Sequence, residues 1–318
     1  MNLAKAPLYT DVASLPAGGE AMFVYGPDDR RVRVARWHGS NPARGKVLIF
    51  PGRTEYVEKY HTTITSLVAD GFGVVVVDWR GQGLSERTIE TSHGHVRRFA
   101  EYQNDLAAAL PLVDELPGPL QALAHSMGGA IALRALSTGC LCEPGRVQRV
   151  VYSAPMLGLV LGNPVLNALI PFLMRLSAAF GRGRRPMPGS PELTTAEHVQ
   201  FKTNRLTSSF ERFEWMRETV EAKPLLRTGG TTVGWLVAAF DEVAELAEAP
   251  APQLPTLCLL GTDERVVSIP IMLGQLERMN KPTLLQVEGA RHEPLFESDE
   301  ITYAIWPKVA AFLRGEPV

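Results

Sequence analysis

The sequence predicts an α/β domain in which a mostly parallel β-sheet is covered by helices on both faces. Two observations carry this prediction: short apolar runs recur along the chain, and helical patterns fill most of the gaps between them. The chain has 318 residues, of which 45% are hydrophobic, and its mean hydropathy is close to zero. It is therefore long enough to bury a large core.

Six runs are almost continuously apolar, as expected of strands that are buried on both faces. They are KVLIF (46–50), GVVVVDW (73–79), LQALA (120–124), RVVYSAP (149–155), TLCLLG (256–261) and TLLQVEG (283–289). Two further β-rich segments, AMFVY (21–25) and RVRVARW (31–37), flank the turn residues GPDDR. This pattern predicts a hairpin.

Helical patterns alternate with these runs, and such alternation is typical of a doubly wound sheet. The predicted helices are YVEKYHTTITSLVADG (56–71), VRRFAEYQNDLAAALPLV (96–113), GGAIALRALSTG (128–139), IPIMLGQLERMN (269–280) and ITYAIWPKVAAFLRG (301–315). We therefore assign residues 1–155 and 246–318 to one α/β core.

Residues 156–245 break the alternation, because they contain helix-like sequence and no strong strand. Their first part overlaps an uncharged stretch of 21 residues, APMLGLVLGNPVLNALIPFLM (154–174). Three interpretations are open for this stretch: a membrane-spanning helix, plain core packing, or an apolar lid over a site. Glycine, asparagine and proline residues divide it into short pieces, and it follows a core strand directly. We favour the lid and predict a helical insertion over residues 156–245.

Charge and cysteine content exclude several classes of protein. The formal net charge is −2, with 32 Lys and Arg residues against 34 Asp and Glu residues, so no basic surface for nucleic acid is predicted. The three cysteines, at positions 140, 142 and 258, form no disulfide framework and fit a reduced, cytoplasmic setting. The N-terminal MNLAKAPLYTDVASLPAGGE lacks the apolar core of a signal peptide, so export by that route is not expected.

The stretch PLQALAHSMGGA (119–130) places a serine where a predicted strand ends and a predicted helix begins. A strand, a tight turn and a helix in this order form a nucleophile elbow, usually written G-x-S-x-G, which exposes the serine hydroxyl. Here the motif reads AHSMG (124–128), so alanine replaces the first glycine and Ser126 is the candidate nucleophile. A serine before two glycines is also a common helix N-cap, and the other loops decide between the two interpretations.

A serine nucleophile needs a base that removes its proton and a carboxylate that orients the base. In folds with this elbow, the acid and then the histidine follow the serine along the chain, each at the carboxyl end of a strand. Asp263 and Glu264 follow one predicted strand, and His292 follows the next. We predict Ser126 as nucleophile, His292 as base and Asp263 as acid, with Glu264 as the alternative acid.

The carbonyl oxygen of a substrate becomes negatively charged during attack, so backbone N–H donors must already point at it. Met127 N–H, at the start of the predicted helix, is the first candidate. The second is Arg53 N–H in the loop PGRTE (51–55), because Gly52 lets the backbone bend towards the substrate. We expect the Arg53 side chain itself to be solvated or paired with Glu55.

With these loops in place, the chain resembles the α/β-hydrolase superfamily, in the branch of bacterial lysophospholipases and monoacylglycerol lipases (the serine-aminopeptidase-like hydrolases). The resemblance covers nearly the whole chain and is carried by six segments. They are IFPGRTEYVEKY (49–60), DWRGQGLSER (78–87), GHVRRFAEYQNDL (94–106), LAHSMGGAIAL (123–133), YSAPMLGL (152–159) and GARHEPLFE (289–297). In that branch H-S-M-G-G is common at the elbow, so Ala124 fits. Pro51-Gly52 replaces the usual H-G of the oxyanion loop, a form that resembles the lysophospholipase side.

The resemblance implies that residues 156–245 form a helical cap whose apolar faces line an acyl-chain pocket. It also implies a serine hydrolase that cleaves carboxylic esters, most of all lysophospholipids, monoacylglycerols or similar mono-acyl lipids, and that requires no cofactor and no metal. Hydrolysis or acyl transfer on other small esters or amides remains open, as does a non-catalytic ligand-binding homologue. An apolar cap predicts transient contact with a membrane surface or micelles, so we expect a cytoplasmic protein peripheral to the inner face of the membrane.

Three other motifs have plainer interpretations. His93 and His95 in SHGHV lack the further ligands of a metal site, so we expect a structural role. His125 directly precedes the candidate nucleophile and should point away from it into the core. The basic stretch GRGRRP (181–186) fits a solvated loop, with contact to a lipid phosphate as the alternative.

Overall fold

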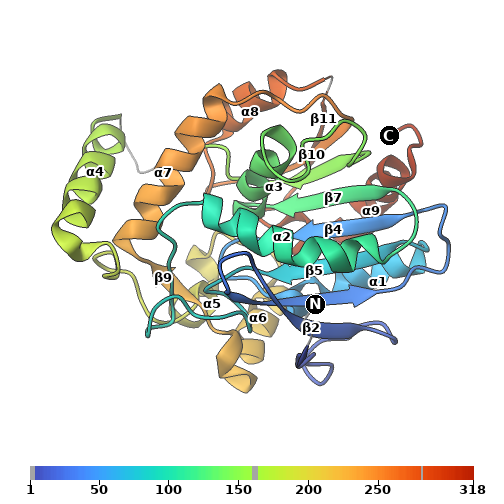
Figure 1. Ribbon diagram of the computed structural model, residues 1–318, viewed down its shortest axis with the longest axis horizontal. Coiled ribbons are helices and arrows are strands. Elements are labelled where there is room, and N and C mark those ends of the chain that lie inside the picture. The colour runs from blue at the N-terminus through green and yellow to red at the C-terminus, as the bar shows by residue number, and fades with distance from the viewer. Residues whose placement is uncertain (1–3, 160–163, 281) are drawn as a thin grey trace.

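The computed structural model describes residues 4–159, 164–280 and 282–318, and it confirms the predicted α/β architecture (Figure 1). Within these residues, nine strands form one sheet in the order β1-β2-β3-β5-β4-β7-β8-β10-β11. Their bounds are β1 (Ala4–Lys5), β2 (Glu20–Tyr25), β3 (Arg31–Trp37), β4 (Lys46–Phe50), β5 (Gly73–Asp78), β7 (Leu120–His125), β8 (Val150–Ser153), β10 (Thr256–Gly261) and β11 (Thr283–Val287).

The sheet is antiparallel at its N-terminal side and parallel elsewhere. β2 pairs with β3 in antiparallel register, which confirms the predicted hairpin, and β3 pairs with β5 in the same way. From β5 across to β11, every neighbouring pair is parallel. Each of the six predicted apolar runs forms one of these strands. The loops after β4, β7, β10 and β11 therefore meet at one edge of the sheet, where sites in such folds are built.

Helices cover both faces of the sheet, as predicted (Figure 1). In the core, they are α1 (His61–Ala69), α2 (Ala100–Asp114), α3 (Met127–Ser137), α8 (Ile269–Glu277) and α9 (Asp299–Arg314). Alternate residues of one strand enter different clusters. Leu48 and Phe50 of β4 pack with α2 and α3, whereas Val47 and Ile49 pack with α1 and α9.

One strand differs from the prediction of burial on both faces. β11 lies at the edge of the sheet, and Val287 is its one fully buried residue, while Leu284 is 41% exposed. Because an apolar run has the same appearance in an edge strand and in a central strand, the sequence pattern did not distinguish the two.

Between β8 and β10 the chain leaves the sheet and forms a mostly helical insertion. Its helices are α4 (Pro164–Ser177), α5 (Thr195–His198), α6 (Phe210–Ala222) and α7 (Val233–Glu248). α4 is the outermost of them and packs on α7 (Figure 1). Within the described residues no helix is both long and apolar enough to cross a bilayer. Residues 160–163 of the uncharged stretch lie outside the described residues.

α7 belongs as much to the core as to the insertion. Trp235, Ala238 and Leu246 of α7 are buried in the same cluster as α2 and α3, and the helix continues past residue 245. We propose to retain residues 156–245 as the cap, with α7 as the helix that fixes it to the core. The remaining short helical turns are η1 (Val57–Tyr60), η2 (Ala178–Arg182), η3 (Phe201–Thr203), η4 (Pro224–Leu226) and η5 (Pro294–Phe296).

A short parallel ladder also ties the insertion to the core. β6 (His93–Gly94) pairs with β9 (Gly229–Thr231), which lies just before α7. The sequence predicts no strong strand in the insertion, and Gly-Gly-Thr has little β-propensity that would indicate one. Backbone hydrogen bonds across the ladder therefore come from tertiary context rather than from the local sequence.

Candidate active site

Ser126 lies in the tight turn between β7 and α3, as predicted. Its backbone φ of 49° and ψ of −118° form a strained conformation for a residue with a side chain. Ser126 N–H donates to the Ser153 carbonyl at 3.0 Å, and its own carbonyl accepts from Met156 N–H at 2.8 Å. A Cβ at Gly128 would collide with the carbonyl oxygen of Phe50. Contacts with β8 and β4 thus hold the elbow, and the second glycine of the motif is needed sterically.

His292 reaches the candidate nucleophile from the loop after β11. Its side chain is nearly fully buried, and Nε2 lies 2.8 Å from Ser126 Oγ. The loop is held by the insertion, because His292 N–H donates to the Arg205 carbonyl at 3.3 Å and Glu293 N–H donates to the Leu206 carbonyl at 2.9 Å. A base at this distance can take the serine proton directly.

The carboxylate beside His292 is Glu264 and not Asp263, so the favoured assignment of the acid is corrected. Glu264 Oε2 lies 2.7 Å from His292 Nδ1, and the Glu264 side chain is fully buried. The Asp263 side chain is 38% exposed and forms ion pairs with Arg265 at 2.6 Å and Arg291 at 3.5 Å. Both acids follow β10, but the turn directs the first to solvent and the second to the imidazole.

The surroundings of Glu264 keep it charged. Burial by itself would raise its pKa, but hydrogen bonds from His292 and from the amides of Val266 and Val267 outweigh burial and hold the pKa below its ordinary value. Val267 N–H donates to Oε1 at 3.2 Å, so both carboxylate oxygens are engaged. A charged Glu264 favours the His292 tautomer with its proton on Nδ1, which leaves Nε2 free to accept the serine proton.

In the loop after β4, the amides on both sides of Arg53 are engaged, and the Arg53 amide is engaged by none of the described residues. Gly52 N–H donates to the Glu55 carboxylate, and Thr54 N–H donates to Gln82 Oε1 at 2.9 Å. Arg53 N–H, between them, has no acceptor among the described residues. Thr54 has a positive φ of 66°, so the loop is bent sharply at this point.

Met127 supplies the other candidate amide. It is the first residue of α3, where backbone N–H groups have no acceptor within the helix and the helix dipole favours an anion. A Cβ at Gly128 would also meet the carbonyl of Pro51, which shows that the start of α3 contacts the oxyanion loop. The structure thus places the two predicted donors on adjoining segments, and their role as an oxyanion hole remains a prediction.

The Arg53 side chain is neither freely solvated nor paired with Glu55, which corrects the prediction. Its Nη2 donates to the Gly229 carbonyl of β9 at 2.8 Å, and its guanidinium lies 5.0 Å from the ring centroid of Trp235. Burial lowers the pKa of Arg53 to about 10. The side chain therefore crosses from the oxyanion loop to the insertion.

Residues 41–299 match a sequence profile described as "Hydrolase_4: Serine aminopeptidase, S33", which covers most of the chain. The chain belongs to this family of α/β-hydrolases.

Several members and structural neighbours of the family are close enough to compare. The chain is 35% identical over 304 residues to Lysophospholipase L2 of Escherichia coli, covering 88% of this chain and 83% of that one. It is 28% identical over 291 residues to Probable lysophospholipase L2 of Haemophilus influenzae, covering 90% of each. A soluble variant of monoglyceride lipase from Saccharomyces cerevisiae, solved with a substrate analog, has a TM-score of 0.71 at 20% identity over 97% of this chain and 99% of that one. This last likeness shows the fold alone.

A buried cluster of charges in this chain lies beside the loops that carry the candidate catalytic residues. Lys59 Nζ lies 2.8 Å from Glu55 and 2.6 Å from Glu293. Burial opposes the charge of Glu55, but the Lys59 cation, with hydrogen bonds from Lys59 and Tyr60, holds its pKa at about 2. Because Glu55 belongs to the oxyanion loop and Glu293 follows His292, Lys59 joins the two loops that flank the nucleophile.

Glu55, His125 and Glu293 are the group of described residues whose side chains approach as metal ligands would, within 4.8 Å of one another. Lys59 already supplies a cation to both carboxylates. Burial lowers the pKa of His125 to about 4, and its Nδ1 lies 2.9 Å from the Ser153 carbonyl. We interpret the group as a structural support, in line with the expected packing role of His125.

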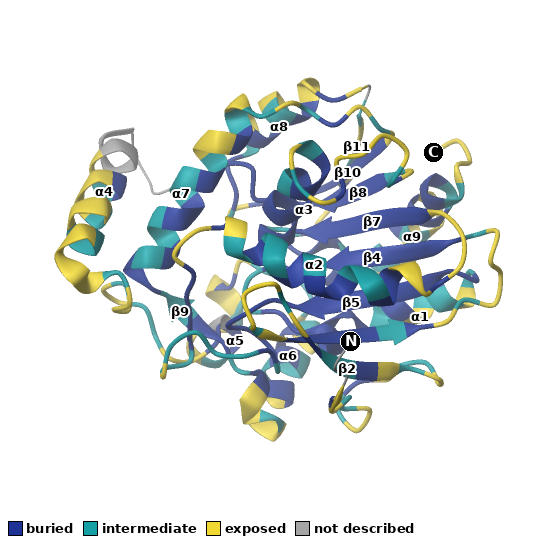
Figure 2. Cartoon of the chain, in the orientation of Figure 1, coloured by how far each residue is buried: buried dark blue, intermediate teal, exposed yellow. Residues whose placement is uncertain are grey.

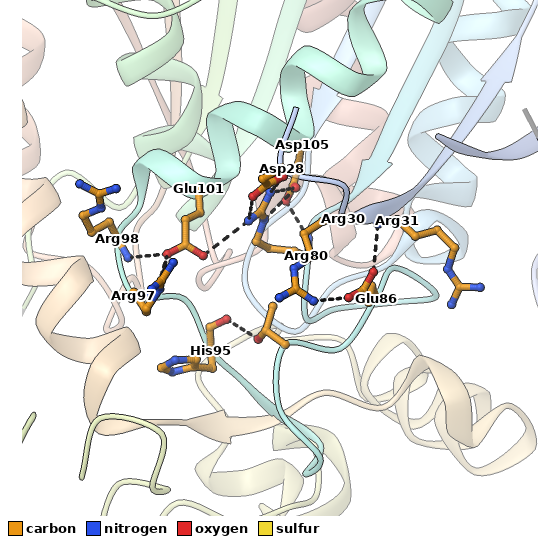
Figure 3. A network of polar contacts seen from close by, with 11 residues as sticks. Asp28, Arg30, Arg31, Arg80, Glu86, His95, Arg97, Arg98, Glu101 and Asp105 are labelled. Atoms are coloured by element: carbon orange, nitrogen blue, oxygen red, sulfur yellow. Dashed lines mark hydrogen bonds and ion pairs between the residues drawn. The ribbon is translucent and has the colours of Figure 1, made fainter. Parts of the chain in front are cut away.

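An ion-pair network anchors the turn after β5 (Figure 3). Arg80 Nε donates to Asp105 of α2 at 2.8 Å, and its terminal nitrogens donate to Asp28 at 2.7 and 3.0 Å. Gln82 follows in the same turn and is almost completely buried. Its Nε2 donates to the Gly52 carbonyl at 3.1 Å, and its Oε1 accepts from the Thr54 amide. The network therefore holds the turn from which Gln82 bonds to the oxyanion loop.

The histidines of SHGHV are bound to neighbouring loops. His95 Nδ1 lies 2.8 Å from Thr232 Oγ1, and His93 Nε2 lies 3.2 Å from the Ser190 carbonyl. Both partners come from the insertion, so the two side chains help to seat it on the core.

Two supporting residues were missed by sequence reasoning. A signal for Gln82 existed, because its amide side chain follows the strand next to β4 and neighbouring parallel strands end side by side. Lys59 offers no such signal, since a lysine in a helical pattern usually lies in solvent.

Proposed function

We propose that the protein is a serine hydrolase that cleaves carboxylic esters of mono-acyl lipids, chiefly lysophospholipids or monoacylglycerols. The observation that carries this proposal is the unbroken chain of hydrogen bonds from Ser126 through His292 to Glu264, built on a strained elbow. The names of the lysophospholipase relatives support the substrate class, and so does the monoglyceride lipase neighbour.

In the first half-reaction, Ser126 Oγ attacks the acyl carbonyl while His292 Nε2 takes its proton. Glu264 holds the imidazole and stabilises the imidazolium that forms. We assign the developing oxyanion to the amides of Arg53 and Met127. Collapse of the intermediate breaks the ester bond, and the alcohol leaves with the proton from His292.

The second half-reaction frees the enzyme. His292 takes a proton from water, whose oxygen attacks the acyl-Ser126 ester, and the fatty acid leaves as the proton returns to Ser126 Oγ. An alcohol in place of water would make the protein an acyltransferase. The same machinery serves both outcomes, so product analysis distinguishes them.

The proposed cap would supply the acyl-chain pocket. A cavity of about 20 Å³ is lined by Thr54 of the oxyanion loop and by Leu206, Met216 and Val220 of the insertion. It is far too small for an acyl chain, so we propose that this part of the cap shifts to admit one. Each buried CH₂ would then contribute about 0.8 kcal/mol to binding.

We further propose that α4 contacts a membrane surface. Much of α4 and of the turn that follows is exposed (Figure 2), and several of the exposed residues are large and apolar. They are Leu169 (46%), Phe172 (62%), Leu173 (44%), Leu176 (46%) and Phe180 (76%). The residues 156–191 contain four arginines and no acidic residue. An apolar face flanked by cations is typical of a helix that lies in the interface of an anionic bilayer, and it supports action at the cytoplasmic face of a membrane.

Vesicle sedimentation tests this contact. A Phe172→Ser/Phe180→Ser variant should bind phosphatidylglycerol vesicles much more weakly than wild type, and wild type should prefer them to phosphatidylcholine vesicles. Tyr303→Ser, at a residue of α9 that is 73% exposed, is the matched control and should bind normally. Unchanged binding of the double variant would remove α4 from the contact.

Activity on a panel of esters tests the function itself. Acyl length is varied while glycerol, phosphocholine-glycerol and simple alkyl leaving groups are compared side by side. Ser126→Ala should lower kcat by about 10⁴ or more. A fluorophosphonate probe should label wild type at Ser126; a folded protein that is not labelled would instead be a non-catalytic binding protein.

A further inference from the structure

The Arg53 guanidinium is partly buried beside the candidate active site, without a carboxylate partner. Its Nη2 bonds to one backbone carbonyl, and its buried Nε has no acceptor among the described residues. Among the described residues, Tyr102 is the one group whose negative charge would offset the Arg53 cation. Tyr102 ionises only far above neutral pH, so it is uncharged under ordinary conditions. The residues outside the description, 1–3, 160–163 and 281, include no acid.

Two other arginines that are wholly or partly buried are compensated. Arg33 lies between two buried carboxylates. Arg87 has no bonded carboxylate, but it donates to four backbone carbonyls and one threonine hydroxyl. Arg53 has neither arrangement, although a guanidinium has five N–H donors to satisfy. A partly buried cation with a buried, unpaired Nε contributes little to folding, so its position is better explained by a ligand than by stability.

The side chain of Arg53 leads away from the reacting carbonyl towards the insertion. Its amide belongs to the proposed oxyanion hole, and its guanidinium ends between β6, β9 and α7. There it faces Trp235, and a Cβ at Gly94 would lie 3.5 Å from Nη2. The backbone amide of Arg53 is therefore placed for the ester carbonyl, and its guanidinium is placed for a substrate group several bonds away from that carbonyl.

We propose that the Arg53 guanidinium binds the phosphate of a lysophospholipid and so selects lysophospholipids over monoacylglycerols. In a lysophospholipid, glycerol joins the acyl ester to a phosphodiester; a monoacylglycerol carries an uncharged hydroxyl at that place. The planar guanidinium matches phosphate oxygens in a bidentate manner. The inference rests on the proposed ester hydrolase function and narrows its substrate class.

Burial does not neutralise this group. The pKa of Arg53 is lowered to about 10, which is still well above neutral pH. The cation is therefore present before the lipid arrives, and an anionic head group would supply the compensation that the chain lacks.

The test compares lysophosphatidylglycerol with a monoacylglycerol of the same acyl chain, both as monomers. Arg53→Gln keeps the backbone amide and removes the cation. It should lower kcat/KM for the lysophospholipid about 10- to 100-fold and for the monoacylglycerol less than about threefold. Arg98→Gln, at an exposed arginine with the same change of charge, should leave both values as in wild type.

Melting temperature separates recognition from a structural role. Arg53→Met should melt at or above the wild-type temperature, because it removes a partly buried charge that no carboxylate compensates. A guanidinium needed for folding would give a clearly lower melting temperature and would overturn the proposal. Arg53→Lys keeps the charge without the planar fork and should retain an intermediate preference for the lysophospholipid.

The remaining outcomes are also decisive. An equal loss on both lipids, or an unchanged ratio in Arg53→Gln, overturns the inference while leaving the hydrolase function intact. Competitive inhibition of monoacylglycerol hydrolysis by inorganic phosphate, without any wild-type preference for the lysophospholipid, would assign Arg53 to a free anion and overturn it as well. If wild type hydrolyses neither lipid, the proposed function itself fails.

Discussion

Replacing Glu264 by glutamine should remove nearly all esterase activity. Glu264 accepts hydrogen bonds on both oxygens, from His292 Nδ1 at 2.7 Å on one and from the amides of Val266 and Val267 on the other. A glutamine has one acceptor and one donor, so it satisfies only one side. If its oxygen stays on the amides, its NH₂ group faces Nδ1 and favours the tautomer that cannot accept the serine proton. If its oxygen faces the imidazole, backbone donors oppose the NH₂ group.

The size of the effect follows from the loss of the correct tautomer. In a serine triad this loss lowers kcat by about 10⁴, equivalent to about 5.5 kcal/mol of transition-state stabilisation. Asp263→Asn breaks ion pairs that are partly exposed and worth about 0–1 kcal/mol, so kcat/KM should change less than about fivefold.

The assay is initial-rate hydrolysis of p-nitrophenyl butyrate, with far-UV circular dichroism to confirm that both variants are folded. The short ester makes few contacts with the cap, so the rate reports on the triad. The assignment of Glu264 would be refuted by a folded Glu264→Gln variant with near wild-type kcat, above all if Asp263→Asn were inactive.

Three further variants test the supports of the site. Gln82→Ala removes the clamp on the oxyanion loop and should lower kcat about tenfold or more with little change in KM; a change confined to KM would contradict it. Lys59→Met leaves two buried carboxylates without their cation, so urea unfolding should show a loss of about 3–5 kcal/mol. Burial lowers the pKa of His61 to about 4 from an ordinary 6.5, so the unfolded state binds this proton more readily than the folded state. The free energy of unfolding therefore keeps its full value above pH 6.5 and decreases by about 3 kcal/mol as the pH falls to 4. His61→Phe keeps the stacking on Trp215 and should lack that part of the decline in urea titrations at several pH values; an identical decline would exclude His61 as its source.

The fold could be predicted because the strands differ so sharply from the helices. Residues 74–77 are four successive valines, all completely buried, and only a sheet covered on both faces can bury such a run. β9 could not be predicted, since its Gly229–Thr231 segment forms a ladder only because β6 lies beside it. The exposed edge position of β11 also depends on the order of strands in space, which no local pattern contains.

Ser126 and His292 could be placed from topology alone. Both follow parallel strands of one sheet, and such strands end at the same edge. The choice between Asp263 and Glu264 could not be made in this way, because both follow the same strand. It depends on the course of the turn, where Asp263 N–H donates to the Ala290 carbonyl at 3.0 Å and Glu264 N–H donates to the Gly261 carbonyl at 3.3 Å. The first of these bonds joins two distant loops, so it has no signature in the sequence around it.

Compensation of charge is the property that local sequence reveals least. The segment PGRTE favours a pair between Arg53 and Glu55, yet Glu55 is taken by the Gly52 amide and by Lys59. Those bonds make the oxyanion loop rigid, and they leave Arg53 to extend towards the insertion without an acid. The Glu55 carboxylate, which would otherwise neutralise the Arg53 cation, is needed to hold the loop. The same bonds therefore keep the Arg53 amide in place and leave its guanidinium without a carboxylate. A variant that frees Glu55, such as Lys59→Met, should therefore weaken the preference for lysophospholipids and also lower stability. If Lys59→Met kept the full preference, the bonds of Glu55 and the charge of Arg53 would be independent of each other.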